Sequence, residues 1–325
     1  MSRISPPIPD SPSAPSCRLS RRNIDGVLLL DKPPGITSNA ALSRIKRLYS
    51  ANKAGHTGTL DPLATGLLPI CLGAATRFAG ALLDARKRYV ATVRFGIATT
   101  TQDAEGEVVD SRDVTFSLDE LRSALARRVG KQFQIPPAYS ALKRDGRPYY
   151  EYARAGIDIE RAPRPIEIHA LELRDWSPPD ATIDIVCSKG TYVRTLAADL
   201  GEALRCGGHL IALRRTASGS FDVADAVALD ELERMDDASR LACLRPVDAL
   251  LAGIPRLELT AAAAFDLGCG RPSTTDASPG RYRVYGPAGR FLGLAQVDDA
   301  RLLAVRLLPA EEHESRANSA RIAPA

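Results

Sequence analysis

The sequence predicts an α+β fold: a mixed, largely antiparallel central sheet with helices, followed by a small β-barrel-like domain. Predicted strands and helices follow one another irregularly, without the βαβ rhythm of a parallel sheet. From about residue 254 the pattern changes to short apolar runs separated by glycines, which is typical of a small barrel. With 45% hydrophobic and 25% charged residues over 325 positions, the chain suits one large domain and a small one.

The first predicted elements are a buried strand and an amphipathic helix. The apolar run in "IDGVLLLDKPPG" (24–35) is stopped by Pro-Pro-Gly, which predicts a strand followed by a turn. "ITSNAALSRIKRLY" (36–49) predicts a helix capped by Thr37 or Ser38. The apolar face of this helix, at helical spacing, consists of Leu42, Ile45, Leu48 and Tyr49. Its outer side is then basic.

Four further elements are predicted between residues 88 and 205. "FSLDELRSALARRVG" (116–130) begins with a capping box of Ser117 and Glu120 and therefore predicts a helix. "ATIDIVCSKG" (181–190) alternates apolar and polar residues, as a half-buried strand does. The other two are a strand over "RYVATVRFG" (88–96) and a helix over "TYVRTLAADLGEALR" (191–205).

These elements divide the chain into four segments. The C-terminal unit combines a helix, "LTAAAAFDLGCGRP" (259–272), with short strands and glycine turns. The proline-rich N-terminus has no apolar core segment, which predicts a disordered leader rather than a secretory signal. We expect a leader over 1–22, a large domain over 23–250, the small domain over 254–310 and a loose tail over 311–325.

The composition excludes several classes of protein. No run of about 18 apolar residues is present, so no membrane-spanning helix is expected. The six cysteines include no Cys-x-x-Cys pair, and none lies at metal-ligand spacing from a histidine. Free thiols in a reducing compartment, the cytoplasm, are the simplest interpretation, and no metal is expected.

Positive charge is concentrated near the start of the chain. Between Arg21 and Val90, eleven Lys or Arg oppose four Asp, a local charge of +7 in a chain whose net charge is +4. A basic segment on an otherwise near-neutral chain fits a polyanion met by one face. A solvated surface without a partner is the alternative that charge alone favours.

One acid stands alone in a tightly punctuated stretch, "KAGHTGTLDPLATGLLP" (53–69). Asp61 precedes a proline, which directs its backbone away from helical geometry. The glycines of the stretch allow the backbone to approach a ligand closely, or merely form tight turns. Taken alone, the Asp-Pro dipeptide is ordinary turn chemistry.

The full string favours a functional interpretation. "GHTGTLDPLATGLLPICLG" resembles the central motif of the TruB family of pseudouridine synthases. Further motifs of that family resemble "GVLLLDKPPGITS", "KRYVATVRFG", "CSKGTYVRTLAADLG" and "LRRTASG", in the family's order between residues 24 and 219. The resemblance implies the pseudouridine synthase fold. It also implies a PUA-like, RNA-binding C-terminal domain, for which the match is weaker.

The resemblance implies an isomerase that converts uridine 55 in the T loop of transfer RNA to pseudouridine. Such an enzyme must flip the nucleotide out of the folded loop before it reacts. The reaction transfers no electrons and needs no donated group, so no cofactor is expected. It does need a carboxylate nucleophile. The sequence leaves open whether this nucleophile attacks the uracil ring or the ribose.

The motifs imply roles for individual residues. Asp61 matches the family's nucleophile, and Arg194 matches an arginine that would hold the carboxylate ionised and oriented. Tyr89 matches the tyrosine that stacks on the target base and is proposed to remove the proton from C5. Residues expected to contact the nucleotide or to support its pocket are His56, Tyr192, Leu213 and Lys32.

Basic residues beside the catalytic loop are candidates for contacts with RNA phosphates, on which RNA recognition generally relies. The main candidates are Arg44, Lys46, Arg47 and Lys53. A second set of candidates is Arg86, Lys87 and Arg88.

The expected partner is transfer RNA, bound through its T arm. Archaeal and eukaryotic relatives work with guide RNAs and partner proteins, but this chain has a compact, bacterial-type arrangement, so neither is expected. Two alternatives stay open: an RNA chaperone without catalysis, and a glycosidase-like hydrolase. A chaperone would not require Asp61, Tyr89 and Arg194 together, and glycosidases commonly use two acids, whereas one stands out here.

Overall fold

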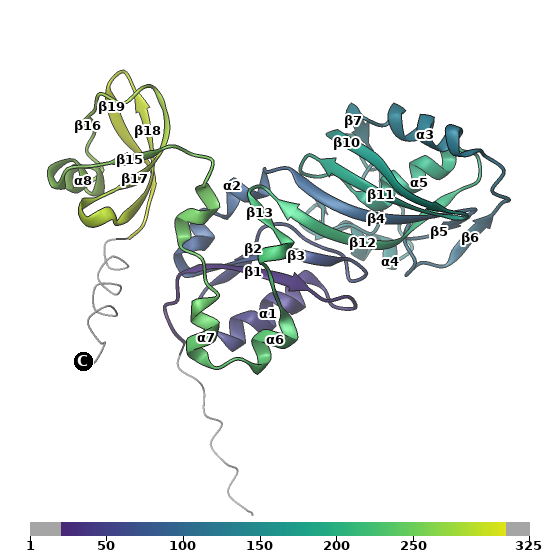
Figure 1. Ribbon diagram of the computed structural model, residues 1–325, viewed down its shortest axis with the longest axis horizontal. Helices are drawn as coiled ribbons and strands as arrows, with labels where there is room; N and C mark the ends of the chain where they lie inside the picture. Colours follow the sequence, from purple (N-terminus) through teal and green to yellow (C-terminus); the bar gives the residue numbers. More distant parts are fainter. Residues whose placement is uncertain (1–20, 310–325) are drawn as a thin grey trace, which may run out of the picture.

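The computed structural model describes residues 21–309, which form a large domain and a small C-terminal domain (Figure 1). The large domain is built around a ten-stranded sheet. Its strands are β1 (Gly26–Lys32), β2 (Ala54–His56), β3 (Thr65–Leu72), β4 (Lys87–Phe95), β7 (Gly130–Gln134), β10 (Arg164–Ser177), β11 (Asp180–Cys187), β12 (Gly208–Ser218), β13 (Phe221–Asp222) and β14 (Val227–Ala228).

The order of the strands is β14-β1-β3-β12-β4-β11-β10-β7, with β2 added at β3 and β13 added at β12. The pairs β1–β14 and β3–β12 are parallel, and the other neighbours in this sheet are antiparallel. The prediction of a mixed, largely antiparallel sheet is therefore confirmed. Two small hairpins lie outside it: β5 (Ile97–Thr99) with β6 (Val108–Ser111), and β8 (Lys143–Arg144) with β9 (Arg147–Pro148).

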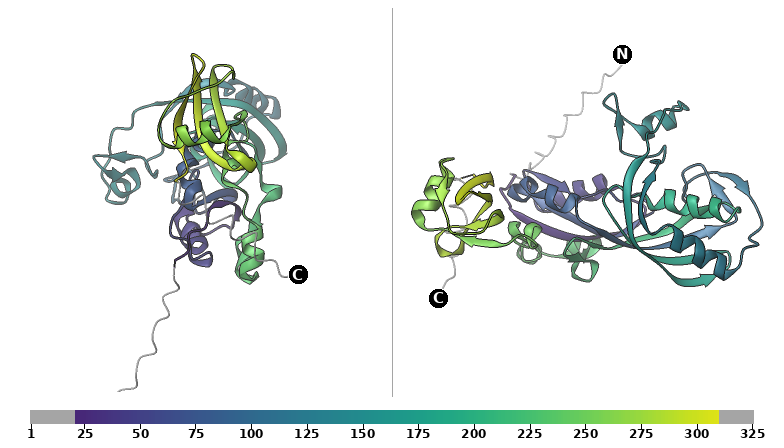
Figure 2. Two further views of the ribbon diagram at one scale, coloured as in Figure 1. Left: turned by 90° about the vertical axis from the view of Figure 1, so that its left-hand side faces the viewer. Right: turned by 90° about the horizontal axis from the view of Figure 1, so that it is seen from above.

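Helices cover part of the sheet and extend from it. They are α1 (Ser38–Leu48), α2 (Ala79–Leu83), α3 (Leu118–Arg127), α4 (Tyr149–Arg154), α5 (Val193–Ala203), α6 (Leu229–Arg234) and α7 (Asp237–Ala242) in the large domain, and α8 (Ala261–Gly268) in the small one. Helices α3 and α5 lie against β4, β10 and β12 and against each other (Figure 1). By contrast, α4 stands on an arm that projects away from the sheet (Figure 2).

Local sequence signals explain where the helices begin. The side chain of Thr37 accepts a hydrogen bond from the Ala40 N–H and caps α1. At the start of α3 both bonds of the capping box are formed: the Ser117 side chain accepts from the Glu120 N–H, and the Glu120 side chain accepts from the Ser117 N–H. The buried face of α1 consists of Ser38, Ala41 and Ile45, with Tyr49 just beyond its end, whereas the predicted Leu42 and Leu48 are half-buried.

Two halves of the sheet meet at a narrow junction. Strands β3 and β12 pair only through Arg214 with Thr65 and Arg215 with Gly66. A Cβ on Gly66 would lie 2.3 Å from the Arg215 carbonyl oxygen, and its φ of +97° suits glycine alone. The close approach of these two strands therefore depends on a residue without a side chain.

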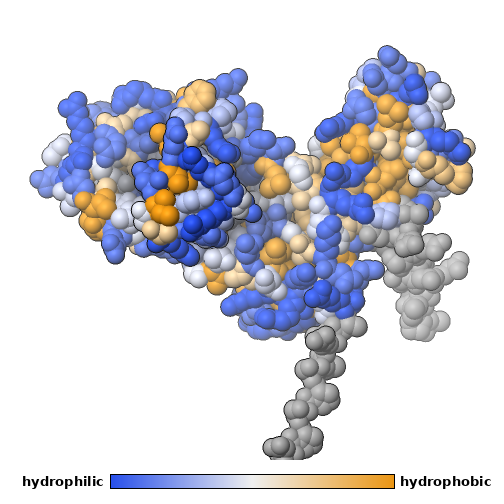
Figure 3. All heavy atoms as spheres, turned by 180° about the vertical axis from the view of Figure 1, so that it is seen from behind, coloured by the Kyte–Doolittle hydropathy of each residue, from blue (hydrophilic) through white to orange (hydrophobic). Residues whose placement is uncertain are grey.

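The C-terminal domain is a five-stranded sheet curled into a half-barrel, in the order β15-β17-β18-β19-β16. Its strands are β15 (Arg256–Glu258), β16 (Ser273–Thr274), β17 (Gly280–Tyr285), β18 (Phe291–Asp298) and β19 (Arg301–Leu307). Aromatic packing joins it to the large domain, with the ring centroids of Phe78 and Phe291 5.6 Å apart. The Tyr285 hydroxyl also donates to Asp248 at 2.6 Å. Apolar side chains gather on the outer surface of this domain, within hydrophilic margins (Figure 3).

The predicted leader and tail lie outside the described residues, except for Arg21 and Arg22. The Arg22 N–H donates to the Ser50 carbonyl at 2.7 Å, and its guanidinium lies 2.9 Å from Asp237. No helix between residues 21 and 309 is long and apolar enough to span a membrane.

Candidate active site

Asp61 lies on the loop between β2 and β3, and both neighbours of Asp61 in the chain are anchored. The Ser38 hydroxyl, 1% exposed at the start of α1, accepts from the Leu60 N–H at 2.8 Å and donates to the Leu60 carbonyl at 2.9 Å. On the other side, the Pro62 carbonyl accepts from the Gly35 N–H at 2.9 Å. The carboxylate thus stands between two fixed points of backbone.

Lys32 completes the support of this loop. Its side chain is fully buried, and its ammonium donates to the carbonyls of Pro33 at 2.8 Å, Ile36 at 2.7 Å and Pro62 at 3.4 Å. Burial lowers the pKa of Lys32 to about 8, although the Asp61 carboxylate acts in the opposite direction. All three of these hydrogen bonds go to backbone carbonyls, so Lys32 ties the turn after β1 to the Asp61 loop.

A buried arginine holds the Asp61 carboxylate with two nitrogens. Arg194 belongs to the first turn of α5, and its Nε lies 2.9 Å from Oδ2 of Asp61 while Nη2 donates to Oδ1 at 3.2 Å. The Arg194 side chain is 5% exposed, whereas 36% of the Asp61 side chain remains exposed. One hydrogen bond from Nη2 and the close ionic contact of Nε together fix the position and the orientation of the carboxylate. Asp61 is therefore the member of the pair that a ligand can reach.

A second carboxylate, Asp103, lies on the other side of Arg194. Its Oδ2 is 3.4 Å from Nη1 of Arg194, and its side chain is 3% exposed. Arg194 also donates to the carbonyls of Thr101 at 3.1 Å and Tyr139 at 2.9 Å. The guanidinium is thereby held by groups that are independent of Asp61.

Sequence reasoning missed Asp103. It stands in a Thr- and Gly-containing turn after β5, "ATTTQDAEG", which looks like an ordinary surface turn. The turn instead docks on β12, where the Ala104 N–H donates to the Leu210 carbonyl at 2.9 Å and the Leu210 N–H to the Gln102 carbonyl at 3.0 Å. Nothing local in the sequence connects this turn to β12 or to Arg194.

Opposing effects act on the protonation of Asp61. Burial raises the pKa of the Asp61 carboxyl above its usual value, and the Asp103 charge raises it further. The Arg194 guanidinium, through its charge and hydrogen bond, and the Lys32 ammonium act in the opposite direction. The net direction is upward, so the group titrates at a higher pH than an exposed aspartate.

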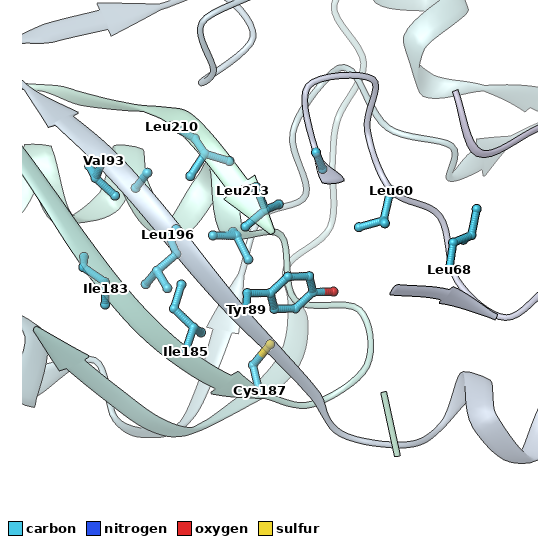
Figure 4. Close-up of a cluster of buried hydrophobic side chains, with 14 of the residues drawn as sticks. Leu60, Leu68, Tyr89, Val93, Ile183, Ile185, Cys187, Leu196, Leu210 and Leu213 are labelled. Atoms are coloured by element: carbon cyan, nitrogen blue, oxygen red, sulfur yellow. The ribbon is translucent and has the colours of Figure 1, made fainter. Parts of the chain in front are cut away.

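Tyr89 stands at the start of β4 and is 8% exposed. Its ring lies among Leu213 of β12, Cys187 of β11 and the loop that carries Leu60 (Figure 4). Burial raises the pKa of the Tyr89 phenol, whereas the Arg215 guanidinium opposes this as a nearby charge and as a hydrogen-bond partner. The phenol oxygen thus shares its surroundings with the loop of Asp61.

Tyr192 is fixed at the N-cap position of α5 by a residue that the sequence did not indicate. The Tyr192 N–H donates to the side-chain oxygen of Gln134 at 2.9 Å, and the Gln134 amide donates back to the Tyr192 carbonyl at 3.1 Å. Gln134, on β7, is 5% exposed. This pair holds the start of α5, and with it Arg194, against the neighbouring strand.

His56 and Leu213 occupy different positions around the site. A ring nitrogen of His56 lies 3.3 Å from the side-chain oxygen of Asn39 on α1. Burial and the Arg215 charge lower the pKa of His56, so its imidazole is neutral at neutral pH. Leu213 is 8% exposed and belongs to the main hydrophobic core together with Tyr89.

The expected phosphate ligands differ in their surroundings. Arg47 and Lys53 are exposed and Lys46 is half-buried. Arg44, with 46% of its side chain exposed, lies 4.0 Å from Glu233. The suggestion for Lys87 is wrong, because this residue is 6% exposed and its ammonium donates to the carbonyls that end α2.

An open cavity of about 400 Å³ lies beside the Asp61 loop, with Leu63, Thr65, Glu105 and Leu213 in its walls. Within residues 21–309, no group of three or more His, Cys, Asp or Glu side chains is arranged to hold a metal ion. The groups that the structure places near this cavity are the fixed carboxylate of Asp61, the guanidinium of Arg194 and the buried phenol of Tyr89.

Comparisons with known proteins agree over nearly the whole described chain. Residues 46–193 match the model of the TruB family pseudouridylate synthase N-terminal domain. Residues 194–252 match the tRNA pseudouridylate synthase B C-terminal domain, and residues 255–308 match the C-terminal model of pseudouridine synthase II TruB.

Curated relatives named tRNA pseudouridine synthase B match most of this chain. The protein from Burkholderia mallei is 53% identical over 305 residues, which cover 91% of this chain and 97% of that protein. The protein from Aromatoleum aromaticum is 56% identical over 282 residues, which cover 86% of this chain and 91% of that protein.

Solved structures support the fold at lower identity. A Cbf5-Nop10-Gar1 complex contains a chain with a TM-score of 0.67 and 24% identity, covering 88% of this chain and 86% of that one. An archaeal box H/ACA sRNP Nop10-Cbf5 complex gives a TM-score of 0.64 and 24% identity, covering 87% and 85%.

Proposed function

Because the chain belongs to the TruB family of pseudouridylate synthases, we propose that it isomerises uridine 55 in the T loop of transfer RNA to pseudouridine. The observation that carries this proposal is the Asp61 carboxylate, held by two nitrogens of Arg194 and still partly exposed on its loop. The substrate comes from the names of the relatives, which are tRNA pseudouridine synthases.

The reaction breaks the bond between N1 of uracil and C1′ of ribose and forms one between C5 and C1′. The proton on C5 leaves, and N1 gains a proton, so atoms and electrons balance without an oxidant, a reductant or a second substrate. We assign the nucleophile to Asp61, because its position and orientation are set before the nucleotide arrives.

Tyr89 is the group we assign to removal of the C5 proton. Its phenol lies beside the Asp61 loop, and the aromatic ring offers a face on which a flipped base can stack. Tyr192, His56 and Leu213 surround the same region and are proposed to contact the nucleotide. We assign Lys32 a supporting role, since its hydrogen bonds go to backbone.

We further propose that the large domain, assigned to 23–250, carries the catalysis and that the small domain, 254–310, adds RNA contacts. Phosphates beside the flipped nucleotide would meet Arg44, Lys46, Arg47 and Lys53. This arrangement needs no guide RNA and no obligate protein partner, and the protein would act in the cytoplasm.

The proposal is tested by mapping pseudouridine on unmodified transfer RNA after incubation with the purified protein, without added cofactor or metal. We expect conversion of one T-loop uridine. Asp61→Asn should lower the turnover by about 10³-fold or more while RNA affinity stays within a few-fold, because the carboxylate acts in the chemistry. Tight binding by the wild-type protein without conversion would favour the chaperone function instead.

A further inference from the structure

Arg215 is a buried cation at the junction of the two halves of the sheet. Its side chain is 1% exposed and is the largest fully buried side chain in the described structure. Among residues 21–309, no carboxylate forms an ion pair with it. A buried charge without a counterion is costly, so its retention needs hydrogen bonds or a function.

The hydrogen bonds of Arg215 go to the two ends of the catalytic loop. Its Nε donates to the Leu67 carbonyl at 2.7 Å, and its Nη2 donates to the Gly58 carbonyl at 3.1 Å. Asp61 lies between these two residues in the chain. One rigid, planar side chain therefore spans the loop that carries the carboxylate.

The strand register places Arg215 beside Tyr89 as well. Arg215 of β12 is directly opposite Tyr89 of β4 on one side and Gly66 of β3 on the other. The guanidinium also interacts with the Tyr89 phenol. The backbone of Arg215 cannot shift toward β3, since it already fills the space that a Cβ of Gly66 would need.

We propose that Arg215 is a positioning residue that holds the Asp61 loop and the phenol of Tyr89 in one fixed arrangement, so that both act on a single uracil ring. This inference rests on the proposed function, because it concerns the step in which the C5 proton is removed. In that step the C5–H bond breaks, the oxygen of Tyr89 in its ionised form takes the proton to become a neutral phenol and the electron pair stays in the ring, while Arg215 donates a hydrogen bond to that oxygen.

The charge of Arg215 supports this role. Burial disfavours the ionised form of Tyr89, and the nearby guanidinium favours it, which assists the oxygen as a proton acceptor. The Asp61 carboxylate disfavours ionisation of the Tyr89 phenol, whereas burial raises the pKa of the neighbouring Cys187 thiol to about 11, so that this thiol is neutral. Arg215 is thus the group whose charge assists the phenol.

The test compares Arg215→Lys and Arg215→Met with the wild-type protein on a T-arm RNA whose target uridine carries hydrogen or deuterium at C5. Single-turnover rates report the chemical steps, and RNA affinity is measured separately. The matched control is Arg94→Lys, since Arg94 lies on β4, the strand that pairs with the β12 of Arg215, but forms a two-nitrogen fork with Asp180, outside the site. Circular dichroism and thermal unfolding identify variants that do not fold.

We expect Arg215→Lys to lower the single-turnover rate by about 10²-fold with RNA affinity within threefold, as a small misplacement of reacting groups does. The deuterium isotope effect should rise above the wild-type value in both variants, and in Arg215→Met, which removes the charge, the rate optimum should also move to higher pH. If Arg215→Met does not fold, the rate and isotope effect of Arg215→Lys, which keeps the charge, are still compared with those of the wild-type protein. Arg94→Lys should leave rate and isotope effect unchanged.

A rate loss with an unchanged isotope effect and pH optimum would mean that Arg215 only maintains the fold, and the inference would be overturned. An unchanged rate in either folded variant would also overturn it. These outcomes leave the proposed function intact, since wild-type conversion is measured in the same experiment. Absence of conversion by the wild-type protein would instead contradict the proposed function and this inference with it.

Discussion

Arg194 lies between two carboxylates that differ in exposure: its Nε is 2.9 Å from the partly exposed Asp61, and its Nη1 is 3.4 Å from the buried Asp103. The Asp103 side chain is 3% exposed and that of Asp61 36%. The buried carboxylate has a structural partner in the guanidinium, and the open one is presented to a ligand. This asymmetry leads to predictions about rate and pH dependence.

The raised pKa of Asp61 predicts that the pH profile of the activity has an acid limb, that is, a fall in rate at low pH. The nucleophile must be ionised, so activity should fall as the pH drops through the pKa of this group. Because burial raises that pKa, the midpoint should lie above the ordinary aspartate value of about 4. Measuring kcat/KM against pH with a T-arm RNA tests this. A rate that stays constant down to pH 4 would contradict the assignment.

Asp103→Asn should lower kcat by about 10- to 100-fold, because the amide no longer orients Arg194 as an ionic partner. The Asp103 charge raises the pKa of Asp61, so its removal should also shift the acid limb to lower pH. The conservative exchange Asp119→Asn on α3 serves as the control, since the ion-pair partner of Asp119 within residues 21–309 is the exposed Arg122. A rate loss without a shift of the acid limb would show that Asp103 acts only through the fold.

Replacing Arg44 and Arg47 together with Ala should weaken RNA binding and reduce its dependence on salt. Each lost phosphate contact removes about 0.7 to 0.9 from the slope of log K against log salt, so two should remove about 1.5. Affinity is measured between low and physiological ionic strength. The control is the pair Arg122→Ala and Arg127→Ala on α3, away from the loop. Equal slopes for the wild-type and the Arg44/Arg47 variant would mean that α1 does not face the RNA.

Gly66→Ala should destabilise the large domain by more than about 1 to 3 kcal/mol, the usual range for strained backbone alone. The added Cβ would lie 2.3 Å from the Arg215 carbonyl oxygen, so two paired strands must separate. Gly146→Ala is the matched control, because its φ is also positive, +79°, but nothing lies within 4 Å of the new Cβ. Comparing the free energies of unfolding in urea of the two variants separates the effect of the steric clash from that of the backbone angle. Equal losses would show that the backbone angle alone matters.

Much of the architecture follows from local sequence. The capping signals at Thr37 and Ser117 begin helices where predicted, because a side chain satisfies the free N–H groups of the first turn. The alternation over 181–190 becomes β11, with Ile183, Ile185 and Cys187 buried on one face. The glycine-punctuated C-terminal pattern becomes the curled five-stranded sheet. These signals depend on neighbours within a few residues.

Local sequence was a poor guide to the environment of charged groups. Lys87 stands in a basic run, yet its ammonium is buried and donates to the carbonyls of Leu82, Leu83 and Ala85. Lys32 likewise donates to backbone, and Asp103 belongs to a turn without a distinctive pattern. Whether a charge is exposed or buried depends on the elements that pack over it, and charge patterning does not contain that information.

The sequence by itself determined the main capped helices and several of the strands, the family resemblance and the acid, Asp61, around which the site is built. The tertiary structure decided which groups surround that acid. Asp61 and Arg194 are 133 residues apart in the chain, and Arg215 reaches Gly58 across 157. Contacts at such separations exist only because β3, β12 and β4 are neighbours in one sheet and α5 packs against it. Periodicity and turns are encoded over a few residues, whereas the position and protonation of a carboxylate depend on which distant segments fold beside it.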